Sequence, residues 1–305
     1  MYTKFTYGAE LEWSDVDRTT PISEQYGVWD KDETTIMNSN GMAIDPTGKR
    51  DTFGGEINTK PTDSIDEQVE AFQALHSLLS PVVLHRNSTH IHIGVPGLVE
   101  DVEALKHLFQ YVQDNQDFVY FDMLAREVPT AEEFPDPEEL KLAKNFNRQR
   151  KYWSKARVPP NRAANVLQAT TPKEFYDRHF QWNEERQRYL YSIGIVRAGI
   201  NVRSMFKYGT VEFRTFAGTV DPQEFRDCFE FADEFVRAGL NDHSRTAKDI
   251  YDSREWNFPK WPPFNPDLDR IFLSTKQGHM EYPDPNAAYQ RRRERERLER
   301  ENKSL

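Results

Sequence analysis

The chain has little cysteine, no long hydrophobic run and no excess of positive charge, and each absence excludes a class of protein. The single cysteine, Cys228, excludes an internal disulfide framework and a thiolate zinc cluster, and it suits a reducing cytoplasm. No apolar run approaches the ~20 residues of a membrane-spanning helix, and we expect no hydrophobic signal segment. The net charge of −10 argues against a protein that coats duplex nucleic acid. We therefore expect a cytoplasmic globular protein without a membrane or duplex nucleic-acid partner.

Among the features that are present, three segments have the periodicity and end signals of amphipathic helices. Ser64 is the predicted cap of the first helix, ahead of an apolar stripe. The second helix is predicted over about 101–125. Asp221 is the predicted cap of the third helix, and Gly239 is its predicted end. Cys228 falls on the apolar stripe of this third helix, so we expect it in the core.

Four further segments alternate apolar with polar residues, which is the pattern of strands with two unlike faces. They are FTYGAELEW (5–13), FGGEINTKP (53–61), STHIHIGV (88–95) and YGTVEFRTF (208–216). In the last segment, strict alternation puts Phe213 on the apolar face. It puts Phe216 on the other face, together with Glu212 and Arg214. The pattern predicts an antiparallel sheet whose apolar face is covered by the helices and whose other face lines a polar site.

The residue types on the polar faces are those of a cation site. The carboxylates are Glu10, Glu12, Glu56 and Glu212, and the other charged or metal-binding groups are His90, His92 and Arg214. Carboxylates are the hard oxygen ligands that magnesium and manganese prefer. A cation would remove the repulsion between the neighbouring Glu10 and Glu12. Several carboxylates, magnesium and an arginine together are typical of a site for a nucleotide polyphosphate.

The motifs YGAELEW, GGEINTKP, STHIHIG and YGTVEFRTFAGT resemble, in this order, those of the amidoligase family. This family belongs to the carboxylate–amine ligase superfamily, with glutamine synthetase and glutamate–cysteine ligase. The resemblance implies an α+β fold with a curved antiparallel sheet of the glutamine synthetase catalytic-domain type, and helices on its apolar face. The catalytic domain would span 1–240, with a helical and loop insertion at about 128–190. A proline- and aromatic-rich strap and a charged tail would occupy 241–305.

The resemblance also implies roles for individual residues. Glu10 and Glu12 would bind separate magnesium or manganese ions, and Arg214 would act with Glu212 in catalysis by contacting the transferred phosphoryl group. Ser88 and Thr89 depart from the family's glycine-rich lead-in to the histidine motif. The implied metal ligands are Glu10, Glu12, Glu56, His90 and Glu212. The implied ATP contacts are His92, Asn201 and Arg203. Lys60 is a further candidate ATP contact, although it stands where the family usually has apolar or small residues.

The activity implied by the resemblance is ATP-dependent formation of an amide through an acyl phosphate. The substrates would be a small carboxylate, such as an amino acid, and an amine, with a modified nucleotide or a peptide as further options. Two alternatives remain. A cupin-like metal enzyme would use His90 and His92, but it requires a carboxylate soon after the second histidine, and residues 93–99 contain none. The second alternative is a binding protein of the same fold that has no catalytic activity.

Overall fold

The structure is a computed structural model, and it describes the chain in separate stretches. The described residues are 2–14, 16–30, 54–83, 87–124, 130–132, 135–137, 140, 160–180, 182–183, 188–189, 198–242 and 244–260. The chain divides into two compact units, Met1–Phe264 and Asn265–Leu305. The predicted charged tail falls in the second unit, outside the described residues. None of the described helices has the length and apolar character needed to cross a membrane.

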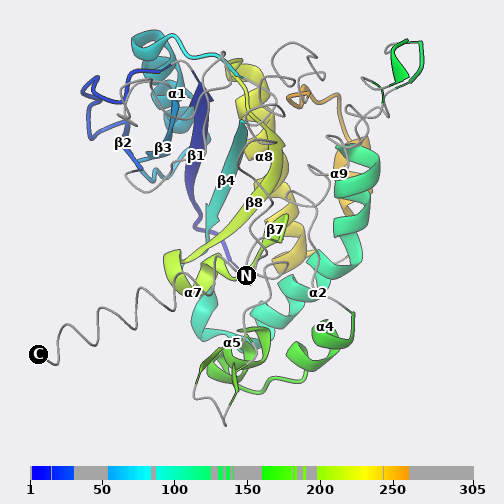
Figure 1. Ribbon diagram of the computed structural model, residues 1–305. Coiled ribbons are helices and arrows are strands. Elements are labelled where there is room, and N and C mark those ends of the chain that lie inside the picture. The colour runs from blue at the N-terminus through cyan, green and yellow to red at the C-terminus, as the bar shows by residue number, and fades with distance from the viewer. Residues whose placement is uncertain are drawn as a thin grey trace, which may run out of the picture. The chain divides into compact units, whose positions relative to one another are not determined.

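Six of the described strands form one open antiparallel sheet (Figure 1). They are β1 Thr6–Ser14, β2 Gly27–Trp29, β3 Gly54–Thr59, β4 Ser88–Gly94, β7 Ile200–Asn201 and β8 Thr210–Ala217. Their order across the sheet is β2-β3-β1-β4-β8-β7, so the four motif strands are direct neighbours. The predicted α+β class and antiparallel sheet are therefore confirmed. A separate two-stranded sheet pairs β5 Trp182–Asn183 with β6 Arg188–Tyr189.

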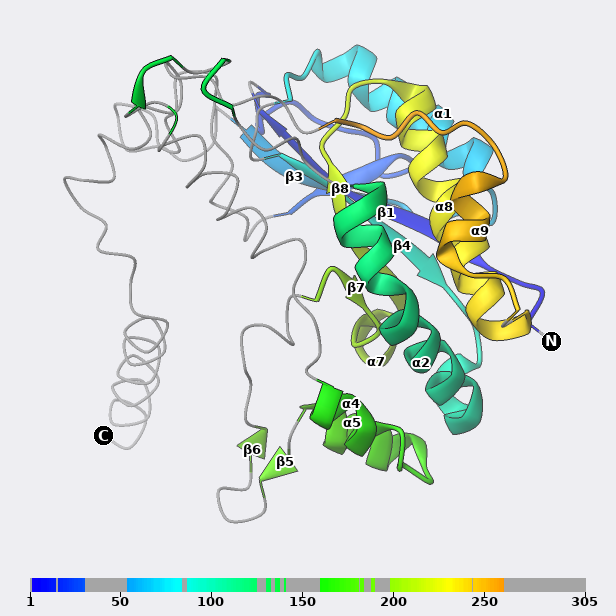
Figure 2. The ribbon, with the colours of Figure 1, turned by 90° about the vertical axis from the view of Figure 1, so that its right-hand side faces the viewer.

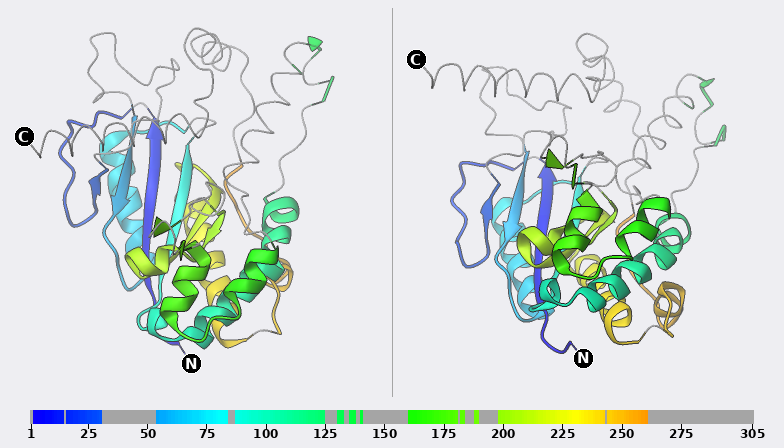
Figure 3. Two further views of the ribbon diagram at one scale, coloured as in Figure 1. Left: turned by 60° about the horizontal axis from the view of Figure 1, so that its bottom comes forward. Right: turned by 90° about the horizontal axis from the view of Figure 1, so that it is seen from below.

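Helices from three parts of the described chain lie on one face of the six-stranded sheet. They are α1 Ile65–Leu79, α2 Val102–Phe118, α8 Pro222–Asn241 and α9 Ala247–Asp252. Figure 2 shows α1, α2 and α8 on the same side of the strands. Further helical elements are η1 Leu98–Glu100, the π-helical turn η2 Val119–Met123, α4 Pro160–Val166, α5 Pro172–Phe180 and α7 Ser204–Tyr208. The α4 and α5 helices lie beside α2 (Figure 3), where Phe109 and Phe175 meet edge to face. The rest of the predicted 128–190 insertion is mostly outside the described residues.

The ends of the predicted helices agree with the structure at two caps and differ at one end. Ser64 and Asp221 cap α1 and α8 by accepting hydrogen bonds from backbone N–H groups of the first turn. The α8 helix continues past Gly239 to Asn241, so the predicted end is wrong. A Cβ at Gly239 would lie 2.8 Å from Leu108 Cδ1 of α2. The glycine therefore permits a close approach of two helices.

The apolar face of the sheet is closed by aromatic and aliphatic packing. Cys228 of α8 is fully buried, as predicted. Phe72 of α1 stacks on Phe225 of α8 with ring centroids 4.3 Å apart, and Phe213 of β8 meets Phe235 of α8 edge to face. The strand side chains in this core include Tyr7, Ala9, Leu11, Trp13, Ile57, Ile91, Ile93 and Val211. The predicted alternation of β1, β3 and β4 is thereby confirmed.

A bulge in β8 corrects the predicted position of Phe216. Ile91 of β4 pairs with Phe213 and Thr89 pairs with Phe216, so two residues of β8 lie opposite one residue of β4. The extra residue reverses the alternation of side chains beyond it. Phe216 is therefore fully buried in the core and stacks on Phe213 with ring centroids 6.4 Å apart. Sequence alternation alone had placed it on the face of Glu212.

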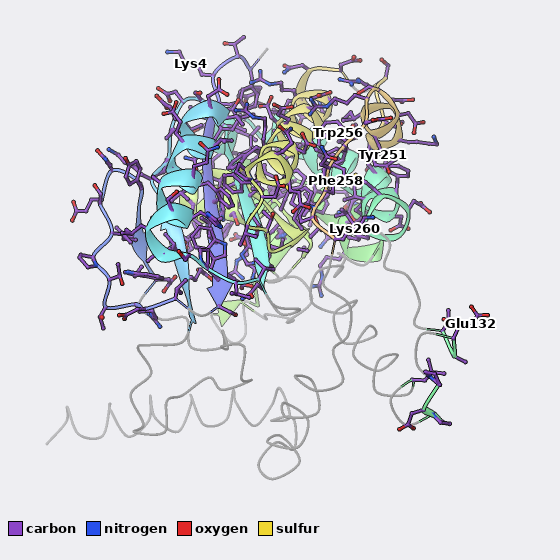
Figure 4. All side chains as sticks on the ribbon, turned by 90° about the horizontal axis from the view of Figure 1, so that it is seen from above. Lys4, Glu132, Tyr251, Trp256, Phe258 and Lys260 are labelled. Carbon is purple, nitrogen blue, oxygen red and sulfur yellow. The ribbon has the colours of Figure 1, made fainter. Side chains whose placement is uncertain are left out.

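The first compact unit continues beyond the predicted boundary at residue 240. Ala247 and Ile250 of α9 are fully buried. The segment 255–260 follows without helix or strand and packs against α8, where Trp256 and Phe258 each meet Phe231 edge to face (Figure 4). Part of the proline- and aromatic-rich segment thus belongs to the same core as the sheet. The remainder of that segment, from residue 261, lies outside the described residues.

Candidate functional site

The register of the sheet brings the polar side chains of separate strands into rows. Glu10 of β1 pairs with His90 of β4, and the next row pairs His92 with Glu212 of β8. Glu212 in turn pairs with Asn201 of β7. Because paired residues on one face have neighbouring side chains, the rows assemble a cluster from residues that are up to 202 positions apart in the chain. The cluster is on the face opposite the helices.

Glu10 is at the centre of this cluster. Its Oε2 atom contacts His90 Nδ1, and its Oε1 atom is 3.2 Å from His92 Nε2. His90 Nδ1 is also 3.9 Å from Glu212 Oε1. One ligand atom from each of Glu10, His92 and Glu212 lies within 4.8 Å of the others. His90 and Glu212 are almost completely buried, with 3% and 4% of their surfaces exposed.

Glu212 connects this centre to Arg214 and to the end of the sheet. Arg214 donates a hydrogen bond from Nη1 to Glu212 Oε1. The other oxygen, Oε2, accepts hydrogen bonds from Asn201 Nδ2 at 2.8 Å and from the Ser204 hydroxyl at 2.7 Å. Arg203, at the start of α7, contributes its backbone N–H, which donates to Asn201 Oδ1 at 3.0 Å. The orientation of Glu212, and through it of Arg214, is therefore set by at least three donors.

The cluster changes the pKa values of its members in opposite directions. Burial alone would raise the pKa of Glu10, but the hydrogen bonds and charges of His90 and His92 outweigh it and hold this pKa well below its ordinary value. Burial alone would lower the pKa of His92, but the hydrogen bond to Glu10 and the charge of Glu212 raise it. These shifts favour the charged form of both groups.

The second pair in the cluster behaves in the same way. Burial would raise the pKa of Glu212, and the nearby charge of Arg214 lowers it instead. Burial would lower the pKa of Arg214, and the charges of Glu212 and Glu10 raise it. The half-buried guanidinium and its buried carboxylate thus stay charged, as is expected of a hydrogen-bonded ion pair.

A second group of carboxylates lies on the β3 side of Glu10. Glu12 of β1 is directly opposite Glu56 of β3, and only 7% of the surface of Glu56 is exposed. Like charges directly opposite each other in a sheet are destabilising. The backbone N–H of Ser88 donates to Glu12 Oε2 at 2.7 Å, and the Ser88 hydroxyl donates to the same oxygen. The same hydroxyl oxygen is 3.0 Å from His90 Nε2.

Lys60 differs from the other candidate residues in its position. It directly follows β3 and is exposed, and its backbone N–H donates to the Tyr26 carbonyl at 3.1 Å. The structure therefore brings together Glu10, Glu12, Glu56, His90, His92, Asn201, Glu212 and Arg214. Arg203 joins this set through its backbone, and Lys60 is at its margin.

Four participants were not identified from the sequence. Ser88 follows the strand alternation, two positions before His90, and this spacing could have revealed it. Ser204 and Thr210 carry no such signal; the Thr210 hydroxyl is 2.9 Å from His92 Nδ1. Gly8 lies in the row of His92, and a Cβ atom built there would meet nothing within 4 Å. Among the described residues, nothing therefore covers the position above Gly8 next to His92.

The donor set fits a divalent cation. Four carboxylates and one guanidinium leave an excess of negative charge when all are ionised, and a cation would offset it. Ligand atoms on opposite sides of a magnesium ion are ~4 Å apart, because each metal–oxygen bond is ~2 Å long. The ligand atoms of Glu10, His92 and Glu212 lie within 4.8 Å of one another, which is close to that span.

Comparison with known proteins does not assign this chain to a family. No family model matches the chain, and the searches of curated proteins and of solved structures returned no match either.

Proposed function

We propose that this protein is an ATP-dependent carboxylate–amine ligase of the amidoligase type, with a sheet of the glutamine synthetase catalytic-domain kind. One observation carries the proposal: the charged residues of all four motifs converge on one face of adjacent strands. The helices cover the other face, so this convergence does not serve the core. Resemblance in the motifs and convergence in space are independent observations that agree.

Magnesium or manganese is the proposed cofactor, and the cluster offers two positions for it. Glu10, His90 and Glu212 would hold one ion, and Glu12 with Glu56 would hold another. When bound, these ions would neutralise the phosphate groups of ATP. His92 faces Glu10 through Nε2 and is held by Thr210 at Nδ1, so it can adjoin either the first ion or the nucleotide.

Activation of the acid substrate is the step assigned to Arg214. A carboxylate is a poor electrophile, so its oxygen would first attack the γ-phosphorus of ATP, giving an acyl phosphate and ADP. The amine would then displace inorganic phosphate and lose a proton. Arg214 is held by Glu212, which is itself held by Asn201 and Ser204, so the guanidinium is preorganised for the charge of the transferred phosphoryl group.

The open space above Gly8 supports an approach path for a substrate beside the charged cluster. Gly8 is flanked in its row by His92, and Lys60 follows the neighbouring strand. A substrate group that entered above Gly8 would lie beside His92 and Glu212, which are in the same row of the sheet. The exposed Lys60 ammonium then remains a candidate contact for a substrate anion.

The first experiment measures ADP release in the presence of Mg²⁺ over pooled amino acids and amines, followed by deconvolution of the active pool. With the active pair known, Arg214→Lys should lower turnover by about 10²-fold or more, roughly 3 kcal/mol, because lysine lacks the planar two-point contact with phosphate. Nucleotide affinity should remain close to that of the wild type. Turnover equal to that of the wild type would contradict the proposed role.

A matched control is Arg226→Lys. Arg226 of α8 pairs with Asp66 through Nη1 at 2.6 Å, so this variant makes the same substitution in an ion pair between helices. It should leave turnover unchanged. Absence of ADP release with every acid and amine, from a protein that still binds nucleotide and Mg²⁺, would contradict the ligase itself.

A second candidate is favoured by one specific contact. Glu10 touches both His90 and His92, so the carboxylate that the histidine motif lacks in sequence is supplied by β1. Two imidazoles and one carboxylate are the ligands of many non-haem iron(II) enzymes. Activity that depends on iron and not on ATP would favour this candidate, but it would leave Glu12, Glu56 and Arg214 without a role.

A further inference from the structure

Ser88 lies between the two sets of acidic residues in the candidate site. It is the first residue of β4 and is almost completely buried, with 8% of its surface exposed. Its backbone N–H and its hydroxyl both donate to one oxygen of Glu12. The same hydroxyl oxygen is 3.0 Å from His90 Nε2. A single side chain therefore touches a ligand candidate of each proposed cation position.

The direction of these hydrogen bonds follows from the number of protons available. A serine hydroxyl has one proton, and a carboxylate can only accept, so the Ser88 proton belongs to the bond with Glu12. Toward His90 the hydroxyl oxygen must then accept, which requires a proton on His90 Nε2. With Nε2 protonated, His90 Nδ1 faces Glu10 Oε2 and, at 3.9 Å, Glu212 Oε1, and it can bind there either a second proton or a metal ion.

A lone pair that faces two carboxylate oxygens is a position for a positive charge, either a proton or a metal ion. Histidine ligands of metals are commonly oriented by a hydrogen bond at their other ring nitrogen. Ser88 makes this bond to His90 and simultaneously holds Glu12. The series of contacts Glu12–Ser88–His90–Glu10 thus connects one set of acidic residues to the other.

We propose that Ser88 is a positioning residue that couples the two divalent-cation positions, by fixing His90 with Nδ1 toward Glu10 and Glu212 and by fixing the carboxylate of Glu12. The inference rests on the proposed metal site, but not on the ligase reaction. Magnesium or manganese alone is the ligand concerned, and turnover is not needed to test it.

The first test is spectroscopic and compares the wild type with Ser88→Ala and Ser88→Thr. Nitrogen NMR of ¹⁵N-histidine-labelled protein with Mg²⁺ reports which ring nitrogen carries a proton, and His90→Asn assigns the signals. The wild type and Ser88→Thr should have a protonated Nε2, and Ser88→Ala should lose this preference. A neutral His90 ring in the wild type with its proton on Nδ1 alone would overturn the proposal.

The second test is titration with Mn²⁺, alone and with a non-hydrolysable ATP analogue. Ser88→Ala should bind Mn²⁺ about 10- to 100-fold more weakly than the wild type, the usual effect of removing a group that orients a metal ligand. Ser88→Thr keeps the hydroxyl and should restore most of the affinity. Ser14→Ala is the matched control, because Ser14 is a buried serine of β1 whose hydroxyl donates to Asn87 Oδ1 at 3.0 Å.

The outcomes separate this inference from the proposed function. Wild-type affinity in Ser88→Ala would overturn the inference, as would a wild type that binds no Mn²⁺ under either condition. If Ser88→Ala does not fold, Ser88→Cys replaces it with the same expectation, because a thiol is a weak donor and acceptor. Weakened Mn²⁺ binding in a protein that never releases ADP would support the inference and contradict the ligase.

Discussion

The two faces of the six-stranded sheet are made by alternate residues of the same strands, yet they follow opposite rules. On the helix-covered face, Leu11, Trp13 and Ile91 are fully buried and contribute by packing. On the other face, Glu10 contributes charge and His90 contributes a hydrogen-bonding contact to it. Burial of apolar surface stabilises the fold, whereas buried charges must be paired to avoid a desolvation penalty.

The comparison teaches that the polar face is maintained at a cost to stability. Glu12 and Glu56 lie directly opposite each other in neighbouring strands. A sheet selected only for stability would not place like charges there. The contrast between the faces can be tested at neighbouring positions, where the same strand contributes one residue to each.

The largest expected effect is on the packed face, at Phe213. This residue is fully buried and meets Phe235 of α8 edge to face at 5.5 Å between ring centroids. Phe213→Ala should lower the free energy of unfolding by about 3–5 kcal/mol, because it removes buried surface and leaves a cavity. Urea denaturation measures the change. The neighbouring Arg214→Lys should alter unfolding far less, and a smaller loss for Phe213→Ala than for Arg214→Lys would contradict the distinction between the faces.

A smaller change in the free energy of unfolding is expected when the pH is varied, and it should come from residues on the charged face. The pKa of Glu10 is lowered in the folded protein from its ordinary value of 4.5. Its stabilisation is therefore present above about pH 4.5 and is lost as the pH falls further. The pKa of His92 is raised from 6.5, so its stabilisation is present below about pH 6.5 and is lost as the pH rises through the folded value.

Glu10→Gln should flatten both slopes, because it removes the carboxyl group that titrates in acid and the hydrogen-bond partner that raises the pKa of His92. The measurement is the free energy of unfolding against pH in the presence of EDTA. Glu103→Gln is the control, since Glu103 is an exposed residue of α2 that pairs with Lys106 at 3.0 Å. If the profile of Glu10→Gln matched that of the wild type at both ends, the coupling of Glu10 to His92 would be excluded.

The smallest effect on stability is expected at Gly8, where no described residue covers the polar face. A Cβ there meets nothing within 4 Å, so Gly8→Ala and Gly8→Val should change the free energy of unfolding by less than about 1 kcal/mol. Binding of ATP or the acid substrate should nevertheless weaken, more for valine than for alanine. Calorimetric titration with nucleotide checks this, and unchanged affinity and turnover in Gly8→Val would show that no ligand uses the space.

Gly94→Ala provides the contrast to Gly8. It is the last residue of the neighbouring β4, and a Cβ there would lie 2.1 Å from Thr6 Oγ1. Thermal denaturation should therefore show a larger loss of stability for this variant than for Gly8→Ala. Equal losses would mean that the two glycines do not differ in their surroundings.

The sequence alone determined the local features that depend on short-range periodicity. Alternation predicted the two faces of β1, β3 and β4, and the capping residues Ser64 and Asp221 predicted the starts of two helices. These predictions succeed because strand and helix geometry are set by successive backbone dihedrals. The motif residues could be assigned to a common polar face for the same reason.

Only the tertiary structure decided which atoms of that face meet. The bulge opposite His90 depends on pairing between strands, and it moves Phe216 into the core against the local pattern. The sequence indicates a helix end at Gly239, whereas the structure shows that α2 packs closely against this position. Ser88 joins Glu12 to His90 because β1 and β4 are adjacent in one register. Such contacts connect residues distant in the chain, and single-sequence periodicity carries no information about them.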